Sequence, residues 1–101
     1  MPYTLDEHLT TYAEEVITID DTSRRLSLSN LYSTPQCRKV EMFLSTAQIR
    51  FRMDGTDPTS TVGDILNPFD RLTTTSMNNA ENFRAIRLGT TNGSLRVKYL
   101  R

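Results

Sequence analysis

The chain has 101 residues, and its 12 basic and 12 acidic side chains leave it with no net charge. This length allows one domain with its own hydrophobic core, and the charge balance argues against a nucleic-acid-binding protein, which normally carries a basic excess that attracts phosphates. The single cysteine, Cys37, excludes an intrachain disulfide, and no apolar run approaches the ~20 residues that span a membrane.

Residues 1–11 show no strand pattern, and we predict that they form an N-terminal arm in front of a β-domain at residues 12–101. An arm without its own core usually becomes ordered against a neighbour. The candidate partner-contact residues are Tyr3, Leu5 and Leu9 of the arm and Tyr12, the first residue of the domain. The N-terminus lacks the basic and then apolar layout of a signal peptide, so we expect the chain in the cytoplasm or in a particle assembled there.

Residues 12–19 predict the first strand, because the last four of them are all β-branched. Residues 20–23 are a turn signal, and the alternation of Leu26 and Leu28 with serines predicts a second strand. Residues 30–36 are rich in polar turn formers and contain a proline, which predicts a loop.

Two consecutive runs show the clearest alternation of apolar and polar side chains. In residues 39–45 the side chains at the even positions are apolar and face one way, and Glu41 and Phe43 face the other. In residues 47–53 four apolar side chains alternate with glutamine and arginine, which predicts a strand with one buried face. The Ser45-Thr46 pair between the runs indicates a tight hairpin or a bend.

The second half of the chain supplies the remaining strands. Residues 54–63 predict a long loop, because Asp54-Gly55 favours a turn and Pro58 blocks strand pairing. Short strands are predicted at residues 65–66, 71–75, 83–88 and 95–100, with a polar connection at residues 77–82 and a hairpin loop at 89–93.

This pattern of about seven or eight short strands, spaced roughly 8–12 residues apart, predicts an all-β protein. We expect a single compact, jelly-roll-like β-sandwich of antiparallel strands. The predicted core residues are Val40, Leu44, Ile49, Phe51, Phe83, Ile86, Leu95 and Val97.

The residue types that carry catalysis are sparse in this sequence. His8 is the only histidine and lies in the unpatterned N-terminal segment, whereas a Ser-His-Asp or Cys-His mechanism needs a positioned imidazole. A zinc site would need several cysteine or histidine ligands. We therefore expect no catalytic residue, no metal, no cofactor and no enzymatic activity.

Three acidic residues in and beside the 54–63 loop leave other chemistries open. Asp54, Asp57 and Asp64 could bind Ca²⁺ together with threonine and backbone oxygens, or two of them could act as a glycosidase pair. Their spacing lacks the alternating aspartates of an EF-hand loop, and aspartate is common at turn starts because it accepts hydrogen bonds from the following amides. We favour the turn role and keep a small hydrolase as a third alternative.

Several short segments resemble a pattern found in small virion proteins of tailed bacteriophages. The matching segments are Phe51-Arg52, Asp54–Thr59, Gly63, Leu66, Asp70, Phe83–Ile86 and Leu95–Tyr99. They lie between Ala47 and Tyr99, about half of the chain, and resemble β-sandwich proteins of the capsid decoration or cement type.

The resemblance implies a non-enzymatic structural protein of the virion, assembled in the host cytoplasm. Its partners would be the major capsid protein or another virion protein, and further copies of itself as a homo-oligomer, with no nucleic acid and no membrane. The arm and the 54–63 loop are the expected contact regions, with Asp54, Asp57 and Thr59 as contact residues of the loop. The alternative is a carbohydrate- or receptor-binding module of a tail or baseplate.

Overall fold

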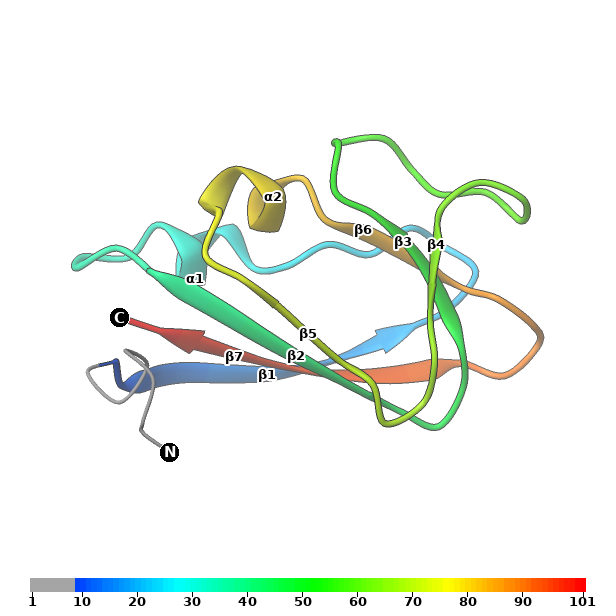
Figure 1. Ribbon diagram of the computed structural model, residues 1–101, viewed down its shortest axis with the longest axis horizontal. Helices are drawn as coiled ribbons and strands as arrows, with labels where there is room; N and C mark the ends of the chain where they lie inside the picture. Colours follow the sequence, from blue (N-terminus) through cyan, green and yellow to red (C-terminus); the bar gives the residue numbers. More distant parts are fainter. Residues whose placement is uncertain (1–8) are drawn as a thin grey trace, which may run out of the picture.

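In the computed structural model, which describes residues 9–101, two antiparallel β-sheets face each other (Figure 1). The four-stranded sheet has the order β1-β7-β2-β5, and the three-stranded sheet has the order β4-β3-β6. The strands are β1 Thr11–Ile19, β2 Lys39–Ser45, β3 Ile49–Arg52, β4 Asp64–Leu66, β5 Arg71–Thr74, β6 Arg84–Arg87 and β7 Gly93–Leu100. The expected sandwich of short antiparallel strands is confirmed.

A single backbone bridge makes the topology that of a jelly roll. Arg24 and Ala85 exchange two N–H···O=C bonds of 2.9 Å each, which places Arg24 beside β6. If this bridge counts as a minimal strand, the second sheet also has four strands, in the order Arg24-β6-β3-β4. Every connection except β3–β4 then crosses from one sheet to the other, as in a two-sheet jelly roll of eight strands.

Two short helices stand where the sequence predicted a strand and a polar connection. The strand prediction is wrong, whereas the polar connection between β5 and β6 contains a helix that the pattern did not predict. Helix α1 is Leu28–Leu31 and helix α2 is Met77–Glu81. Each begins after a serine whose hydroxyl accepts a hydrogen bond from a backbone N–H: Ser27 from Asn30 at 3.3 Å, and Ser76 from Asn79 at 3.2 Å. Serine is among the best residues at this capping position, and this cap outweighs the leucine alternation.

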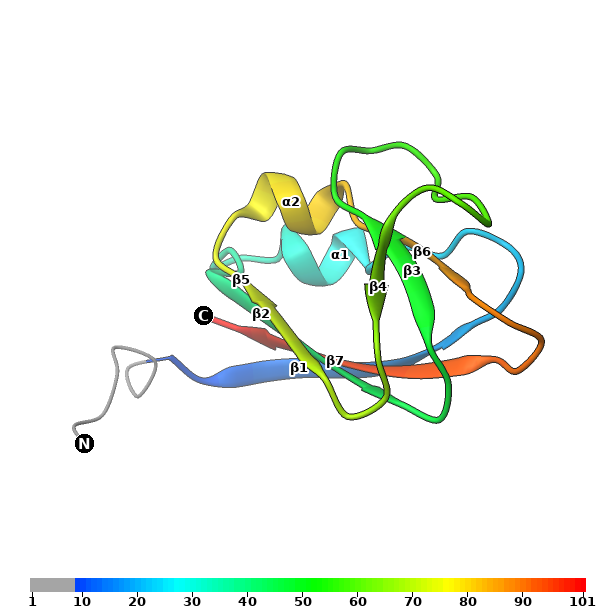
Figure 2. The same ribbon diagram turned by 45° about the vertical axis from the view of Figure 1, so that its right-hand side comes forward.

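The helices complete the core where the second sheet ends. Figures 1 and 2 show α1 and α2 side by side above one half of the four-stranded sheet, and β3, β4 and β6 above the other half. Leu31 of α1 and Ala80 of α2 are fully buried. The helices therefore cover the part of the four-stranded sheet that the strands of the smaller sheet are too short to reach.

The core lies between the sheets, and all predicted core residues except Ile86 are buried. Phe51 and Phe83 stack within it, with ring centroids 5.8 Å apart. In β6 it is Ala85 that is buried, so its neighbour Ile86 faces outward. Strand side chains alternate with a period of two, so Phe83 and Ile86 cannot point to the same face.

The predicted hairpin at residues 89–93 is also wrong. Strand β6 pairs with β3, whereas β7 pairs with β1 and β2 in the other sheet. The turn residues correctly predict that the chain reverses direction here. A connection of this length can join paired strands, but it can also bridge the ~10 Å between two packed sheets, as it does in this domain. At Ser45-Thr46 the chain likewise passes from β2 in one sheet to β3 in the other, so the bend, not the hairpin, is confirmed.

The sheet begins within the segment that was expected to be the arm. Thr10 exchanges two backbone hydrogen bonds with Arg101, of 3.0 and 3.1 Å, and Thr11 is the first residue of β1. Residues 1–8, with Tyr3 and Leu5, lie outside the described residues, so an arm there stays a prediction. Between residues 9 and 101 no helix is long and apolar enough to cross a membrane.

Candidate protein-interaction surface

The acidic side chains of the 54–63 loop are engaged in local turns. The Asp54 carboxylate accepts hydrogen bonds from the Thr56 hydroxyl at 2.6 Å and the Thr56 N–H at 3.0 Å, and also from the Arg52 guanidinium. These donors, led by the Thr56 hydroxyl, lower the pKa of Asp54 to about 2. The expected turn role of Asp54 is confirmed.

The rest of this loop is held in the same way. Asp57 accepts a hydrogen bond of 2.8 Å from Ser23, and Thr59 accepts bonds from the N–H groups of Thr61 and Val62 at 3.3 and 3.0 Å. Within residues 9–101, His, Cys, Asp and Glu side chains nowhere gather in a group of three that could hold a metal ion. The loop is thus a well-connected projection, and its partner role stays a prediction.

A wide depression of about 450 Å³ lies beside this loop. It is lined by Phe51, Arg52, Met53, Asp54, Val62, Gly63 and Asp64. It connects the loop with β3 and with β4, the edge strand of the smaller sheet.

The two predicted contact residues at the start of the domain pack mainly within the chain. Leu9 is half-buried. The Tyr12 hydroxyl donates to the carbonyl of Asn30, and the Arg101 guanidinium carbon lies 4.1 Å from the centre of the Tyr12 ring. Tyr12 therefore links the first strand to the C-terminal residue, and only the part of its ring that Arg101 does not cover is available to a partner.

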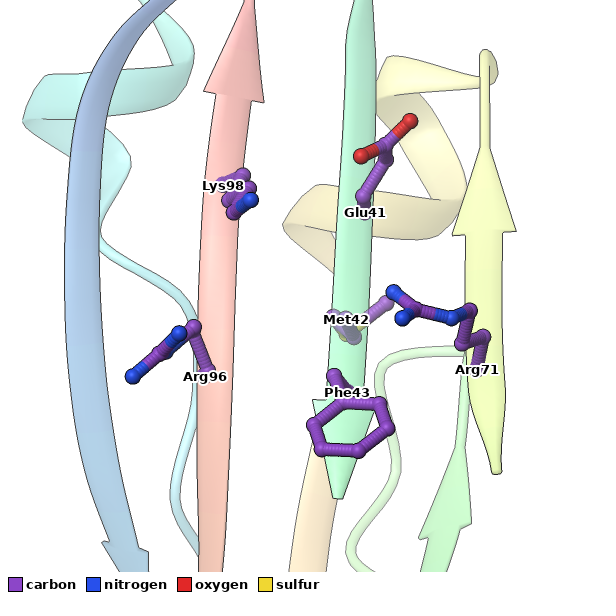
Figure 3. A pocket seen from close by; sticks show the side chains of 6 residues that line it. All are labelled: Glu41, Met42, Phe43, Arg71, Arg96 and Lys98. Carbon is purple, nitrogen blue, oxygen red and sulfur yellow. The ribbon is translucent and has the colours of Figure 1, made fainter. Parts of the chain in front are cut away.

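The outward side chains of the four-stranded sheet form a second, more distinctive surface. The strand register arranges them in two rows across the sheet, Glu14–Lys98–Glu41–Thr73 and Val16–Arg96–Phe43–Arg71. These residues and the adjacent Phe69 are referred to below as the outer face. Figure 3 shows its centre, a depression of about 150 Å³ lined by Glu41, Met42, Phe43, Arg71, Arg96 and Lys98.

Aromatic rings and arginine meet in the second row. The Arg71 guanidinium carbon lies 4.8 Å from the centre of the Phe43 ring, within the range of a cation–π interaction (Figure 3). The Phe69 ring is 6.3 Å from the Phe43 ring at an angle of 47°, and Phe69 is 74 % exposed. At the other end of the row, Val16 is 62 % exposed. The row thus alternates apolar side chains with guanidinium groups.

Two cations of the outer face, Lys98 in the first row and Arg96 in the second, have no ion-pair partner among residues 9–101. Lys98 lies opposite Glu14 on β1 and Glu41 on β2, yet it forms an ion pair with no residue between 9 and 101. Glu41 pairs instead with Lys39, at 3.4 Å. Arg96 also has no hydrogen bond or ion pair within the described part of the chain, and Figure 3 shows its side chain reaching toward β1.

The sequence pattern contained part of this surface. It placed Glu41 and Phe43 on the side of their strand away from the core, which is confirmed. A phenylalanine on a polar strand face is an unusual residue there, and it was the one local signal that could have marked the surface. Its neighbours Arg71 and Arg96 come from β5 and β7, and only the strand order brings them to Phe43.

Comparison of the chain with models of known protein families, with curated proteins and with solved structures returned no match. A role for this domain therefore has to be argued from its surface.

Proposed function

We propose that this chain is a non-enzymatic structural protein of a tailed-bacteriophage virion, of the capsid cement or decoration type. The outer face is the observation that carries the proposal. Exposed Phe69 and Val16, together with Phe43, Arg71 and Arg96, give it the aromatic and arginine-rich composition of protein–protein interfaces. Such a surface is suited to assembly contacts.

The position of the 54–63 loop supports a bridging role. In Figure 1 the loop lies on the opposite side of the sandwich from β1 and β7, so it points away from the outer face. The Ser23–Asp57 hydrogen bond ties it to a neighbouring connection. A cement protein contacts at least two neighbours, and two separate contact regions on one small domain fit that need.

The jelly-roll topology is compatible with the proposal but does not decide it. Viral capsid proteins and lectins both use this fold, and one fold serves many functions. The resemblance of residues 47–99 to phage virion proteins favours the first of these classes.

Quantitative peptide mass spectrometry of purified phage particles from the source tests the proposal. A ratio of one chain per one to a few major capsid subunits would support the cement role. A handful of copies per particle would move the protein to the tail or neck, and its absence from particles would overturn the virion assignment. For the surface itself, Phe69→Ser should lower the copy number, whereas Leu28→Ser, at a side chain that is 41 % exposed on α1 and outside both contact regions, is the control for a lost apolar group.

The second candidate is a carbohydrate- or receptor-binding module of the tail or baseplate. The 150 Å³ depression favours it, because an aromatic ring beside cationic and acidic side chains could hold a charged sugar. A glycan array separates the two candidates. Binding to a defined acidic glycan that is lost in Arg71→Gln would favour the module, and a blank array with a high copy number in particles would favour cement.

A further inference from the structure

The two central strands of the four-stranded sheet present complementary side chains at the same level. On β7 the residues that belong to the two rows are Arg96 and Lys98, both cations. On β2 their direct neighbours are Phe43 and Glu41, an aromatic ring and a carboxylate. One central strand therefore offers cations, and the other offers the groups that attract cations.

This pattern is complementary to itself under a twofold rotation. Consider an axis parallel to the strands that passes between β7 and β2, in front of the outer face. The rotation lays β7 of one copy on β2 of the other and keeps each row at its own level. Lys98 then faces Glu41 of the second copy, Arg96 faces Phe43 of the second copy, and both contacts occur twice.

The outer strands are compatible with the same arrangement. The rotation exchanges β1 with β5, so the exposed Val16 meets Arg71 of the second copy, and Glu14 meets Thr73. No two groups of equal charge meet in these two rows. The Arg71 guanidinium group already lies over the Phe43 ring, so its aliphatic stem is available to cover Val16.

We propose that the outer face binds a second copy of this chain in an isologous, twofold-symmetric dimer. The inference rests on the proposed function in so far as that function makes the outer face an assembly contact, and it names the occupant. It leaves the 54–63 loop and the smaller sheet, on the other side of the domain, to contact the capsid.

The size of the face sets the expected strength of the dimer. Four strands about 4.8 Å apart and about seven residues long cover roughly 19 by 23 Å, or about 440 Å² on each copy before side-chain relief is added. The total buried area is then on the order of 1,000 Å², near the lower limit for a specific interface. We therefore expect a weak, reversible dimer.

Sedimentation equilibrium of the full chain over about 1 to 500 µM tests this dimer with charge-reversed variants. Lys98→Glu places two carboxylates against each other twice in a dimer, and Glu41→Lys does the same with two ammonium groups. Each variant alone should dimerise at least tenfold more weakly than the natural chain. An equimolar mixture of the two should dimerise like the natural chain, because the mixed dimer again pairs opposite charges at both contacts.

Two controls keep the test specific. Asp21→Lys makes the same size of charge change at an exposed loop residue outside the outer face and should leave the dimer intact. Circular dichroism and urea unfolding of each variant show that it still folds. Lys98→Glu is the cleaner of the two variants, because Glu41→Lys also removes the ion pair with Lys39.

The outcomes separate this inference from the proposed function. A natural chain that stays monomeric at the highest concentration, or a dimer that survives both charge reversals, would overturn the twofold contact. A mixture that stays monomeric would overturn the pairing of Lys98 with Glu41. A monomeric protein found in many copies on particles would leave the cement role standing without the dimer, and a dimer that is absent from particles would do the reverse.

Discussion

Two phenylalanines of this domain should respond very differently to substitution by alanine. Phe83 is fully buried and stacks on Phe51, whereas Phe69 is 74 % exposed on the outer face. We predict that Phe83→Ala is severely destabilising, whereas Phe69→Ala costs only about 1 kcal/mol of stability but weakens the dimer. The pair therefore separates core residues from interface residues with one chemical substitution.

The magnitudes follow from burial. Truncating a buried phenylalanine to alanine costs about 3–5 kcal/mol, because transfer free energy is lost and a cavity remains. A domain of this size is stable by only about 5–15 kcal/mol, so Phe83→Ala removes a large fraction of the total. About a quarter of Phe69 is covered, which corresponds to about 0.5 kcal/mol. Its contact with Phe43 adds on the order of 0.5 kcal/mol.

Urea unfolding followed by circular dichroism measures both effects. The measurement belongs at a protein concentration well below the dimer dissociation constant, because association would otherwise add apparent stability to the natural chain. The expected shift of the unfolding midpoint is about 2 M for Phe83→Ala and within about 0.5 M for Phe69→Ala. Similar losses for the two variants would refute the assignment of Phe69 to an interface, because they would show that Phe69 belongs to the packed core.

Three further predictions concern single contacts. Thr56→Val should raise the pKa of Asp54 from about 2 toward 3.8, as measured by NMR titration of the carboxyl carbon. The depressed pKa of the natural chain adds stability above pH 3.8, and this stability is lost as the pH falls toward 2. The variant should therefore lose less stability across that pH interval. Tyr99→Phe removes a buried hydroxyl that donates to a β1 carboxylate and should cost about 1.5 kcal/mol in urea unfolding. The raised pKa of the Tyr99 hydroxyl makes the natural chain lose stability as the pH rises above 10, so the stability difference between the two chains should shrink there. Gly63→Ala should destabilise the fold by about 1–3 kcal/mol, since φ is 129° at this residue and the new Cβ would lie 2.8 Å from a side-chain carbon. Gly89→Ala is the control, because its Cβ would meet nothing within 4 Å, and it should be neutral or slightly stabilising in the same assay.

The sequence pattern predicted those parts of the fold that depend on local alternation. Residues 39–45 and 49–52 show apolar side chains at every second position, and they form β2 and β3 with those side chains buried. The short strands β4 to β7 were also placed within a few residues, because turn residues separate them. A period of two is a property of one strand alone, so it can be read without knowing the partner strand.

The errors arise where a choice depends on distant parts of the chain. Leu26 and Leu28 alternate with serines as in a strand, but the Ser27 cap and the space left beside the smaller sheet favour one turn of helix from Leu28 to Leu31. The turn at 89–93 looks like a hairpin, but β7 takes the place between β1 and β2, whose residues are far from it in the sequence. The outer face was missed for the same reason, because its rows exist only in the strand order.

Phe69 gives an argument for the outer face that is independent of the charge pattern. It has a φ of 71°, in the left-handed region that a bulky side chain seldom occupies. The turn around it is fixed by a hydrogen bond of 2.6 Å from the Phe69 N–H to the Leu44 carbonyl, and by Asp70, which accepts one of 3.0 Å from the Asn67 N–H. Glycine would fit this turn without strain, and a polar residue would suit its exposure. The chain instead holds an aromatic ring out beside Phe43, where strain and exposure are offset once a partner surface covers both rings.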